Sequence, residues 1–479
     1  MEKKKSRSGA TSGRARKRQR RQRQIIIRAG ALAIVLIGLT AAIWGVSAGI
    51  KRSNKKRTEE KAAIEAQIQA EEEALMNRKR LLAEAKTLAA GYDYEGALEL
   101  IKSIDGYEQD ADLVAAAAEY AAAKSTLVTV DAGTVQHLFF RPLIYDYDRA
   151  FNVALQGQST VDTLKAWTLT VEEFQRILNQ MYENGYVFVS IHDLVDITTN
   201  DDGTYTMKKS KSIKLPEGKT PVLLSIDDMS YYHSYENRGF ADKLVLTETG
   251  EIKAQYTDAA GSVQVGDYDI IPILETFFKE HPDASYRGAR GMIALTGYNG
   301  VFGYRTDRAY QTRENIASDQ QNWLNKHPDY NWDSEVAEAT RIADALKAHG
   351  WEFACNTWGK VNLSSASLET AKEDYEKWTS TVANIVGETD VLVFPYGSDM
   401  GNWKDYTTDN ALYAYYKSQG MKFFCNVDTT QKVWIQIREQ YLRQGRINVD
   451  GAMLNRMIAG NSEVLSEVFD VNQVCGTYR

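Results

Sequence analysis

Short apolar runs alternate with amphipathic helix patterns from about residue 127 onward, and this alternation restricts the fold more than any other feature of the chain. PVLLSI (221–226) has the composition of a buried strand, and WEFACN (351–356) follows the helix pattern SEVAEATRIADALKAHG (334–350). Strands that are joined by helices lie parallel in one sheet. We therefore expect an α/β domain over residues 129–479, a parallel sheet or barrel whose functional residues lie at the carboxyl ends of the strands.

A capping box marks the start of one of these helices. Thr170 and Glu173 predict a helix that runs through Asn184 and ends at Gly185, and the strand YVFVSI follows at 186–191. Such caps pair backbone groups that the first and last turns of a helix leave unpaired. They therefore predict the bounds of this helix as well as its existence.

The segment Ala29–Ile50 contains 22 residues without a charge. At 1.5 Å per residue, a helix of this length covers the roughly 30 Å hydrocarbon layer of a membrane. Twelve Lys or Arg precede the segment and five follow it in KRSNKKR. We therefore predict a transmembrane signal-anchor helix over residues 25–50, with the basic tail (1–24) in the cytoplasm and the rest of the chain outside the cell membrane.

This N-terminal region also has features of two other kinds of segment. VSA at 46–48 resembles the cleavage site of a signal peptide, although the apolar part of such a peptide spans only about 7–15 residues. The basic tail also has the charge of a nucleic-acid arm. Because the chain beyond residue 57 is strongly acidic and the basic residues flank the apolar segment, we expect no nucleic-acid partner.

Residues 51–128 are rich in Ala, Glu, Lys and Leu and contain no proline, which predicts a helical stalk. Around GYDYEG (91–96) the apolar spacing indicates a hairpin that looks like a single tetratricopeptide-type unit. Solenoids of such units need about three copies, so a spacer is favoured over a scaffold that binds a protein partner. Three cysteines follow, Cys355, Cys425 and Cys475, and their spacing fixes neither a disulfide framework nor a thiolate zinc site.

The motif SIDDM (225–229) ends an apolar strand with two carboxylates, Asp227 and Asp228. Their side chains diverge, so one suits a metal ion and the other suits proton transfer. An aspartate pair in a turn is the alternative. The position at the carboxyl end of a strand favours an active site.

Three motifs in order, PVLLSIDDM, HGWEFACNTWGK and VFPYG, resemble those of the polysaccharide deacetylases, also called the NodB-homology or carbohydrate esterase family 4 group. HPDASYRGARG and IALTGYNGVFGYRT look like a membrane-anchored branch of that group, and the resemblance extends from about Gly133 to the end. It implies a distorted (β/α) barrel that removes acetyl groups from N- or O-acetylated glycans with a divalent, zinc-type metal.

The resemblance also implies roles for individual residues. Asp227 would be the catalytic base, Asp228 the first metal ligand, and the backbone N–H of Tyr396 part of the oxyanion site. The two metal-binding histidines of the family fall on Asn356 and Lys360. An amide oxygen is a weak zinc ligand and lysine is normally protonated, so we expect that Lys360 pairs with Asp228 in place of a metal.

Other departures concern the partners of these residues. The arginine that orients the base falls on Val393, and no histidine follows His349 to serve as the general acid. His233 is a possible substitute ligand, and His137 is a second histidine that a packed N-terminal strand would bring to the site. Sugar contacts are expected from Trp358, Tyr298, Tyr304 and Pro395.

Taken together, these features predict a membrane-anchored, extracytoplasmic pseudoenzyme of polysaccharide-deacetylase type. It would bind a cell-wall or surface glycan of the peptidoglycan kind, with metal-dependent catalysis lost or impaired. An active glycan deacetylase with an atypical metal site is one alternative, and a scaffold that acts through the stalk is the other.

Overall fold

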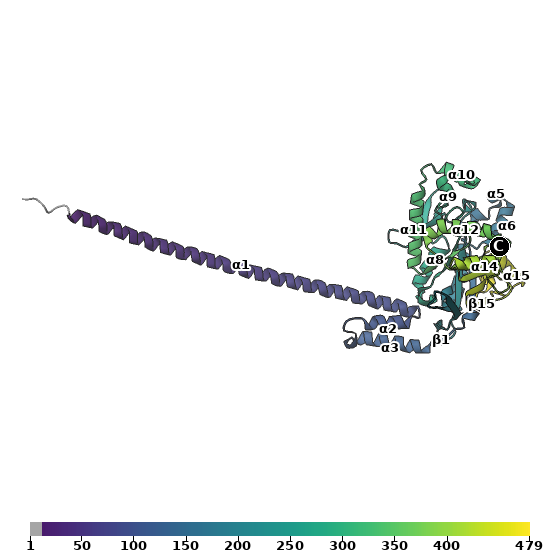
Figure 1. The fold of residues 1–479 in the computed structure, drawn as a ribbon, viewed down its shortest axis with the longest axis horizontal. Coiled ribbons are helices and arrows are strands. Elements are labelled where there is room, and N and C mark those ends of the chain that lie inside the picture. Colours follow the sequence, from purple (N-terminus) through teal and green to yellow (C-terminus); the bar gives the residue numbers. More distant parts are fainter. Residues whose placement is uncertain (1–11) are drawn as a thin grey trace, which may run out of the picture. The chain divides into compact units, whose positions relative to one another are not determined.

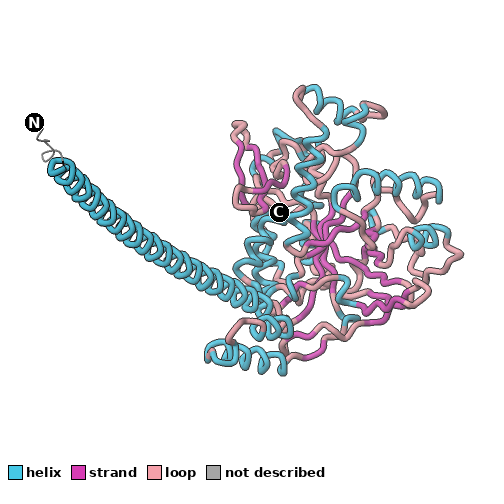
Figure 2. Tube along the Cα trace, turned by 60° about the vertical axis from the view of Figure 1, so that its left-hand side comes forward, coloured by secondary structure: helices cyan, strands magenta, loops and turns pink. Residues whose placement is uncertain are grey.

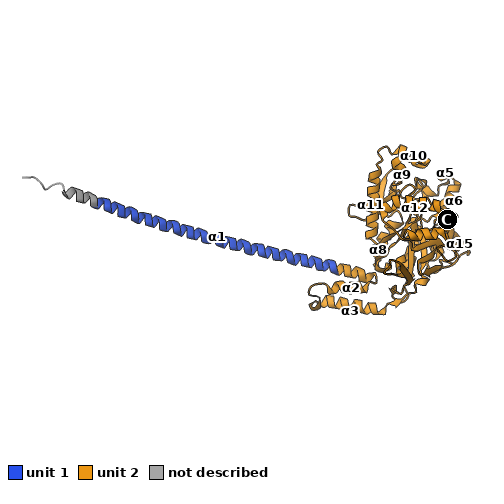
Figure 3. Cartoon of the chain, viewed as in Figure 1, with its two compact units in different colours: residues 1–81 blue, residues 82–479 orange. Residues whose placement is uncertain are grey.

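The computed structural model describes residues 12–479, and the chain divides into two compact units at residues 81 and 82 (Figure 3). The hairpin helices α2 (Tyr94–Lys102) and α3 (Ala111–Thr126) therefore belong to the second unit. The turn before α2 is anchored to this unit: Tyr92 is buried, and its hydroxyl donates a hydrogen bond to the Asp283 carbonyl at 2.7 Å.

A single helix, α1 (Ser12–Ala90), contains both the predicted apolar segment and the first part of the predicted stalk. From residue 20 onward, this helix is long and apolar enough to cross a membrane. Its large apolar side chains are exposed, including Ile34 (73%) and Trp44 (78%). A helix that is apolar on all sides and has no protein partner suits a lipid environment. Residues 1–11 of the basic tail lie outside the described residues.

The second unit is a distorted (β/α) barrel (Figures 1 and 2). Within the described residues, seven parallel strands close it in the order β7, β11, β12, β13, β14, β16, β2 and back to β7. These strands are β2 (Gln136–Phe140), β7 (Thr220–Asp227), β11 (Gly291–Leu295), β12 (Trp351–Cys355), β13 (Val391–Val393), β14 (Phe423–Val427) and β16 (Tyr441–Asn448). The α/β barrel expected from the sequence is thus confirmed.

The barrel is distorted because one extra strand pairs with part of β7 and another pairs with part of β16. β3 (Tyr186–Phe188) pairs with the first part of β7, on the edge that β11 occupies further along. β15 (Ile435–Arg438) pairs antiparallel with β16, on the edge that β2 occupies further along. Smaller sheets are formed by β1 (Val128–Thr129) with β6 (Lys214–Leu215), by β4 (Val195–Thr199) with β5 (Tyr205–Lys209), and by β8 (Lys243–Leu246), β9 (Ile252–Thr257) and β10 (Val263–Gly266).

Helices cover the outer face of the strands, as the alternation in the sequence predicts. The longer ones are α6 (Gln158–Trp167), α7 (Val171–Glu183), α8 (Ile270–Glu280), α10 (Ser318–Lys326), α11 (Trp332–Ala348), α12 (Leu368–Trp378), α14 (Ala411–Ser418) and α15 (Gly451–Ile458). The shorter ones are α4 (Tyr147–Ala150), α5 (Val153–Gln156), α9 (Arg308–Thr312), α13 (Asn384–Val386) and α16 (Val471–Val474). The predicted capping box of Thr170 and Glu173 is present at the start of α7.

Side chains alternate between the two faces of each strand, as the two-residue period of a strand requires. Leu224 and Ile226 of β7 belong to a core cluster that includes Phe174 of α7, so this face points outward to the helices. Leu223 of β7 belongs to a second cluster, with Leu442 of β16, that fills the barrel interior. The inward positions that follow Leu223 along β7 carry polar side chains, and these positions lead to the candidate site.

Candidate functional site

Asp227 lies at the last position of β7 and faces the barrel interior, two residues beyond Ser225. Its carboxylate accepts two hydrogen bonds from the Arg446 guanidinium, at 2.7 and 3.0 Å. Arg446 lies on β16 and is 1% exposed, and it also donates to the Ser225 hydroxyl at 3.0 Å. Such a two-point contact between planar groups fixes the orientation of the carboxylate.

This contact corrects an expectation from the sequence. Because Val393 occupies the family position of the arginine, Asp227 was expected to lack an orienting partner. The structure supplies that partner from β16 instead of the loop after β13, because β7 and β16 both pair with β2 and their inward side chains meet over that strand. Arg446 also stacks over the Phe139 ring at 4.3 Å, which holds the guanidinium in place.

Asp228 is the residue after β7, and it adopts a left-handed backbone conformation with φ 65°. This turn directs its carboxylate to the barrel mouth, by which we mean the carboxyl ends of the barrel strands. There the Lys360 ammonium contacts one carboxylate oxygen, and the Arg141 Nε lies 3.6 Å from the other. The Tyr232 hydroxyl donates a further hydrogen bond at 3.3 Å.

These cations determine the ionisation of Asp228. Burial by itself raises the pKa of a carboxyl group, but Lys360 and Arg141 outweigh it and hold the pKa of Asp228 below its ordinary value. Arg141, which follows β2, also reaches Asp450 at 3.4 Å. Arg141 thus lies between Asp228 and Asp450 at the mouth, and Asp228 has Lys360 as a second cation.

Lys360 and Thr357 lie in the loop after β12, and both have left-handed backbones, with φ 54° and 55°. Asn356 begins this loop, and its amide donates to the Val393 carbonyl at 3.3 Å, so it is bonded to β13 and not to Asp228. Non-glycine residues persist in this conformation only where the surrounding structure requires it, often at functional sites. The loop therefore brings the Lys360 side chain to Asp228, while Asn356 stays in the wall of the barrel.

These residues do not fit a zinc ion. Zinc takes about four nitrogen, sulfur or oxygen ligands, of which a catalytic site supplies about three from the protein. Among residues 12–479, no group of three or more His, Cys, Asp or Glu is placed to hold a metal. At Asp228 the neighbouring groups are an ammonium and a guanidinium, which carry the charge of a metal ion but have no lone pair for one.

Neither histidine that was considered as a substitute ligand contacts Asp228 in the described part of the chain. Both ring nitrogens of His233 have other partners, Glu236 and the Tyr310 hydroxyl, each at 2.5 Å. His137 lies inside the barrel, and its Nε2 is 3.0 Å from the Ser225 hydroxyl. Burial and the Arg446 charge lower the pKa of His137 well below its ordinary value, so the ring is neutral.

The residues that the sequence singles out for the oxyanion site and for sugar contacts are placed in three different ways. Tyr396 is 74% exposed in the loop after β13 and has a left-handed backbone, with φ 60°. Trp358 and Tyr298 meet edge to face at 6.3 Å and are half-buried. Tyr304 is a core residue, 4% exposed, whose hydroxyl bonds the Leu244 carbonyl, and Pro395 is also buried. These last two offer no face to a sugar, which corrects the expectation for both.

Comparisons with known proteins add little to this geometry. The chain is similar in structure to the Streptococcus pyogenes deacetylase PplD in complex with acetate, with 12% sequence identity and a TM-score of 0.33 over 70% of this chain and 100% of that one. A TM-score this low assigns neither a site nor an activity. No protein-family model matches the chain, and no curated protein matches it significantly.

Sequence reasoning missed the partners Arg141, Arg446 and Asp450. HLFFR places Arg141 directly after the apolar strand β2, whereas GRINVD places Arg446 within β16 and Asp450 two residues after it. Lys, Arg, Asp and Glu are almost never fully buried unless they are paired. A charge at such a position therefore indicates an ion pair, although the sequence does not say with which strand.

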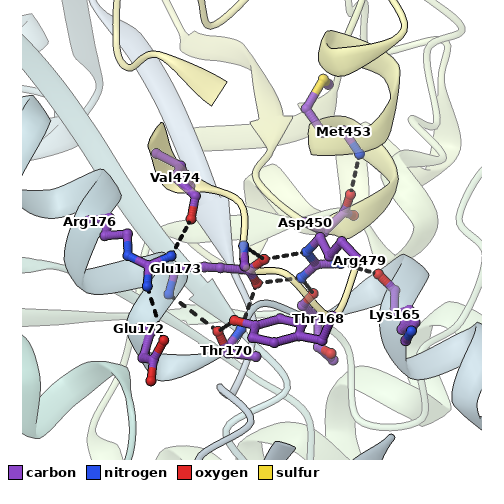
Figure 4. Close-up of polar contacts among 12 residues, drawn as sticks. Lys165, Thr168, Thr170, Glu172, Glu173, Arg176, Asp450, Met453, Val474 and Arg479 are labelled. Carbon is purple, nitrogen blue, oxygen red and sulfur yellow. Dashed lines mark hydrogen bonds and ion pairs between the residues drawn. The ribbon is translucent and has the colours of Figure 1, made fainter. Parts of the chain in front are cut away.

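The C-terminal segment supports this side of the mouth (Figure 4). Arg479 donates to the buried Glu173 carboxylate of α7 and to the carbonyls of Lys165 and Thr168, at the end of α6. A Cβ atom on Gly451 would overlap the Arg479 guanidinium. Arg479 therefore packs against the first residue of α15, next to Asp450, which caps that helix by accepting a bond from the Met453 N–H.

Proposed function

We propose that the barrel mouth binds an acetylated cell-wall or surface glycan without metal-dependent catalysis, outside a membrane to which α1 anchors the chain. The observation that carries this proposal is the pairing of Asp228 with Lys360 and Arg141. Two cations occupy the surroundings of the carboxylate that the motif resemblance assigns to a metal. The glycan comes from that resemblance, and the exposed Tyr396 and half-buried Trp358 at the mouth are in keeping with it.

The arrangement retains groups that bind a neutral sugar. Lys360 is 32% exposed and donates hydrogen bonds, while Asp228 accepts them. Because Asp227 is held by Arg446 and Asp228 by its two cations, both carboxylates are fixed before a ligand arrives. A site that needs no rearrangement loses less entropy on binding.

An active glycan deacetylase is the second candidate, and one observation favours it. The bidentate contact between Arg446 and Asp227 gives the expected base a fixed orientation, which a proton acceptor needs. Lys360 at Asp228 opposes it, because an ammonium excludes the metal ion from that carboxylate. We therefore place this candidate second.

The test uses the full-length chain, purified in detergent from cells grown with zinc. We expect metal content well below one ion per chain, no acetate release from N-acetylglucosamine oligosaccharides, and measurable binding of those oligosaccharides by calorimetry. Lys360→Met removes the ammonium from the mouth and should weaken binding by about tenfold. Stoichiometric zinc together with acetate release would replace this proposal by the second candidate.

The double substitution of Asn356→His with Lys360→His is the positive control for the metal measurement. It puts histidines at the two positions where the motif resemblance expects them, one of which replaces the Lys360 ammonium beside Asp228, and two imidazoles with a carboxylate are a ligand set that zinc favours. We expect this variant to gain zinc, and Asn356→His alone to gain none because Lys360 remains. If the double variant binds no zinc, positions 356 and 360 do not form the metal site that the motif resemblance implies.

A further inference from the structure

A cavity of about 690 Å³ lies beside the barrel mouth, between the loop after β7 and the segment that contains α10 and the start of α11. Its volume is within the range of about 300–1,000 Å³ that is typical of ligand sites. Tyr232 lines this cavity and also donates a hydrogen bond to Asp228. Tyr232 therefore contacts both the cavity and the mouth.

The floor of the cavity contains a buried cation. Arg305 is 4% exposed, and it donates to the Tyr231 carbonyl at 2.9 Å and lies 3.5 Å from Glu236. Its Nε has no hydrogen-bond partner among residues 12–479. Because this atom is enclosed by protein, a ligand in the cavity meets Arg305 as a fixed positive charge behind the floor and not as a hydrogen-bond donor at Nε.

The charges around the cavity identify the class of that ligand. Four Lys or Arg and four Asp or Glu line it, and they include Lys326 and Asp329 at exposed positions. Lysine and arginine only donate hydrogen bonds, whereas ionised carboxylates only accept them. An anion would meet four carboxylates, and a cation would meet four positive charges. A neutral molecule with many hydroxyl groups satisfies both kinds, because each hydroxyl donates and accepts.

Aromatic rings brace the walls of the cavity. Tyr235 stacks on Phe240 at 4.4 Å, and Trp323 packs edge to face with Tyr330 at 5.5 Å. His327 stacks on Trp323 at 4.0 Å, so the faces of these rings are largely covered by one another. The rings therefore form a rigid wall, and the recognition of a ligand falls to the polar groups.

From these observations we infer that the cavity is a second subsite for a neutral sugar residue, continuous with the mouth through Tyr232. This inference rests on the proposed function, since it takes the sugar in the cavity to belong to the glycan that occupies the mouth. A glycan chain long enough to fill both places gains hydrogen bonds to exposed lining groups such as Lys326 and Asp329. Affinity should therefore rise with chain length.

The experiment measures binding of the di-, tri-, tetra- and pentasaccharide of N-acetylglucosamine to the full-length chain in detergent. For the wild type we expect the dissociation constant to fall by about tenfold from the disaccharide to the longer sugars. Ser334→Trp places a large side chain in the cavity at an exposed serine in the first turn of α11, without removing any packed residue. This variant should bind the disaccharide as the wild type does and lose the gain with length.

Two further variants complete the design. Asp329→Asn removes one carboxylate charge at the rim and should reduce the gain by about threefold. Ser159→Trp makes the same change as Ser334→Trp at an exposed serine in the first turn of α6, outside the cavity, and should behave as the wild type. Circular dichroism of each variant checks that it is folded, and if Ser334→Trp is not, Asp329→Asn decides.

The outcomes separate this inference from the proposed function. If the wild type binds none of the sugars, the proposed function fails. If it binds them with the same affinity at every length, or if a folded Ser334→Trp keeps the full gain, the mouth binds glycan and the second subsite does not exist.

Discussion

At the scale of single residues, Asp228 links three parts of the chain. It follows β7 in a left-handed turn and is paired with Arg141, which follows β2, and with Lys360 from the loop after β12. Aspartate accepts this conformation at less cost than most residues. The position therefore suits a carboxylate that must leave the strand and turn toward the mouth.

The lowered pKa of Asp228 predicts a pH-dependent contribution to stability. A carboxyl group whose pKa is lower in the folded chain stabilises the fold above its unfolded pKa of about 4, and this contribution is lost as the pH falls through the folded value. Asp228→Asn should therefore be less stable than the wild type at neutral pH, because two cations lose their charged partner. The difference should shrink as the pH falls below about 4.

Urea unfolding of both proteins, followed by near-ultraviolet circular dichroism across this range, checks the prediction. Comparing the two proteins at each pH cancels the titration of all other groups. A difference in unfolding midpoint that stays constant down to the lowest pH would show that the charge of Asp228 contributes nothing.

At the scale of elements, the C-terminal segment fixes α6, α7 and α15 to one another. Glu173 is 0% exposed and belongs to the capping box of α7, and Arg479 neutralises its charge (Figure 4). Removing one member of a buried ion pair leaves the other charge without compensation, which costs about 3–5 kcal/mol. The pair is therefore more important for holding these helices together than an exposed pair would be.

Arg479→Met should lower the free energy of unfolding by about 3–5 kcal/mol. The matched control is Arg341→Met, which breaks an exposed pair with Glu338 and should change it by less than about 1 kcal/mol. Adding Glu173→Gln to Arg479→Met should recover part of the loss, since no buried charge remains. Urea titration measures all four proteins, and equal effects of the Arg479 and Arg341 substitutions would refute this account.

At the scale of the whole molecule, the chain consists of two units, a long exposed helix and a barrel (Figure 3). The apolar part of α1 and the excess of positive charge before it favour a cytoplasmic N-terminus and an extracytoplasmic barrel. A glycan-binding role requires this orientation, because cell-wall glycans lie outside the membrane.

Tags at both ends of the chain test the orientation in intact cells. Protease added outside should remove the C-terminal tag and leave the N-terminal tag protected on a membrane-bound fragment. Loss of the N-terminal tag before any protease is added would indicate a cleaved signal peptide. Protection of the C-terminal tag would place the barrel in the cytoplasm and contradict the proposed function.

The sequence by itself determined the elements and their order, because these depend on local periodicity. The capping box of Thr170 and Glu173, the strand PVLLSI and the helix 334–350 are all present close to their predicted bounds. It also singled out Asp227 and Asp228 at a strand end, and the contact of Lys360 with Asp228 is present in the structure. The roles that the motif resemblance gives to these residues stay predictions.

Only the tertiary structure decided which side chains meet. Asp227 is paired with Arg446 and not with the family arginine, whose position Val393 occupies. Arg446 lies more than two hundred positions along the chain from Asp227. The two residues meet because the barrel brings the inward face of β16 to that of β7. Tyr304 and Tyr396 have the same side chain, yet one is in the core and the other is exposed. Local patterns set the backbone of each element, but ion pairs and burial depend on contacts between elements that are distant in sequence, and those contacts exist only once the barrel has closed.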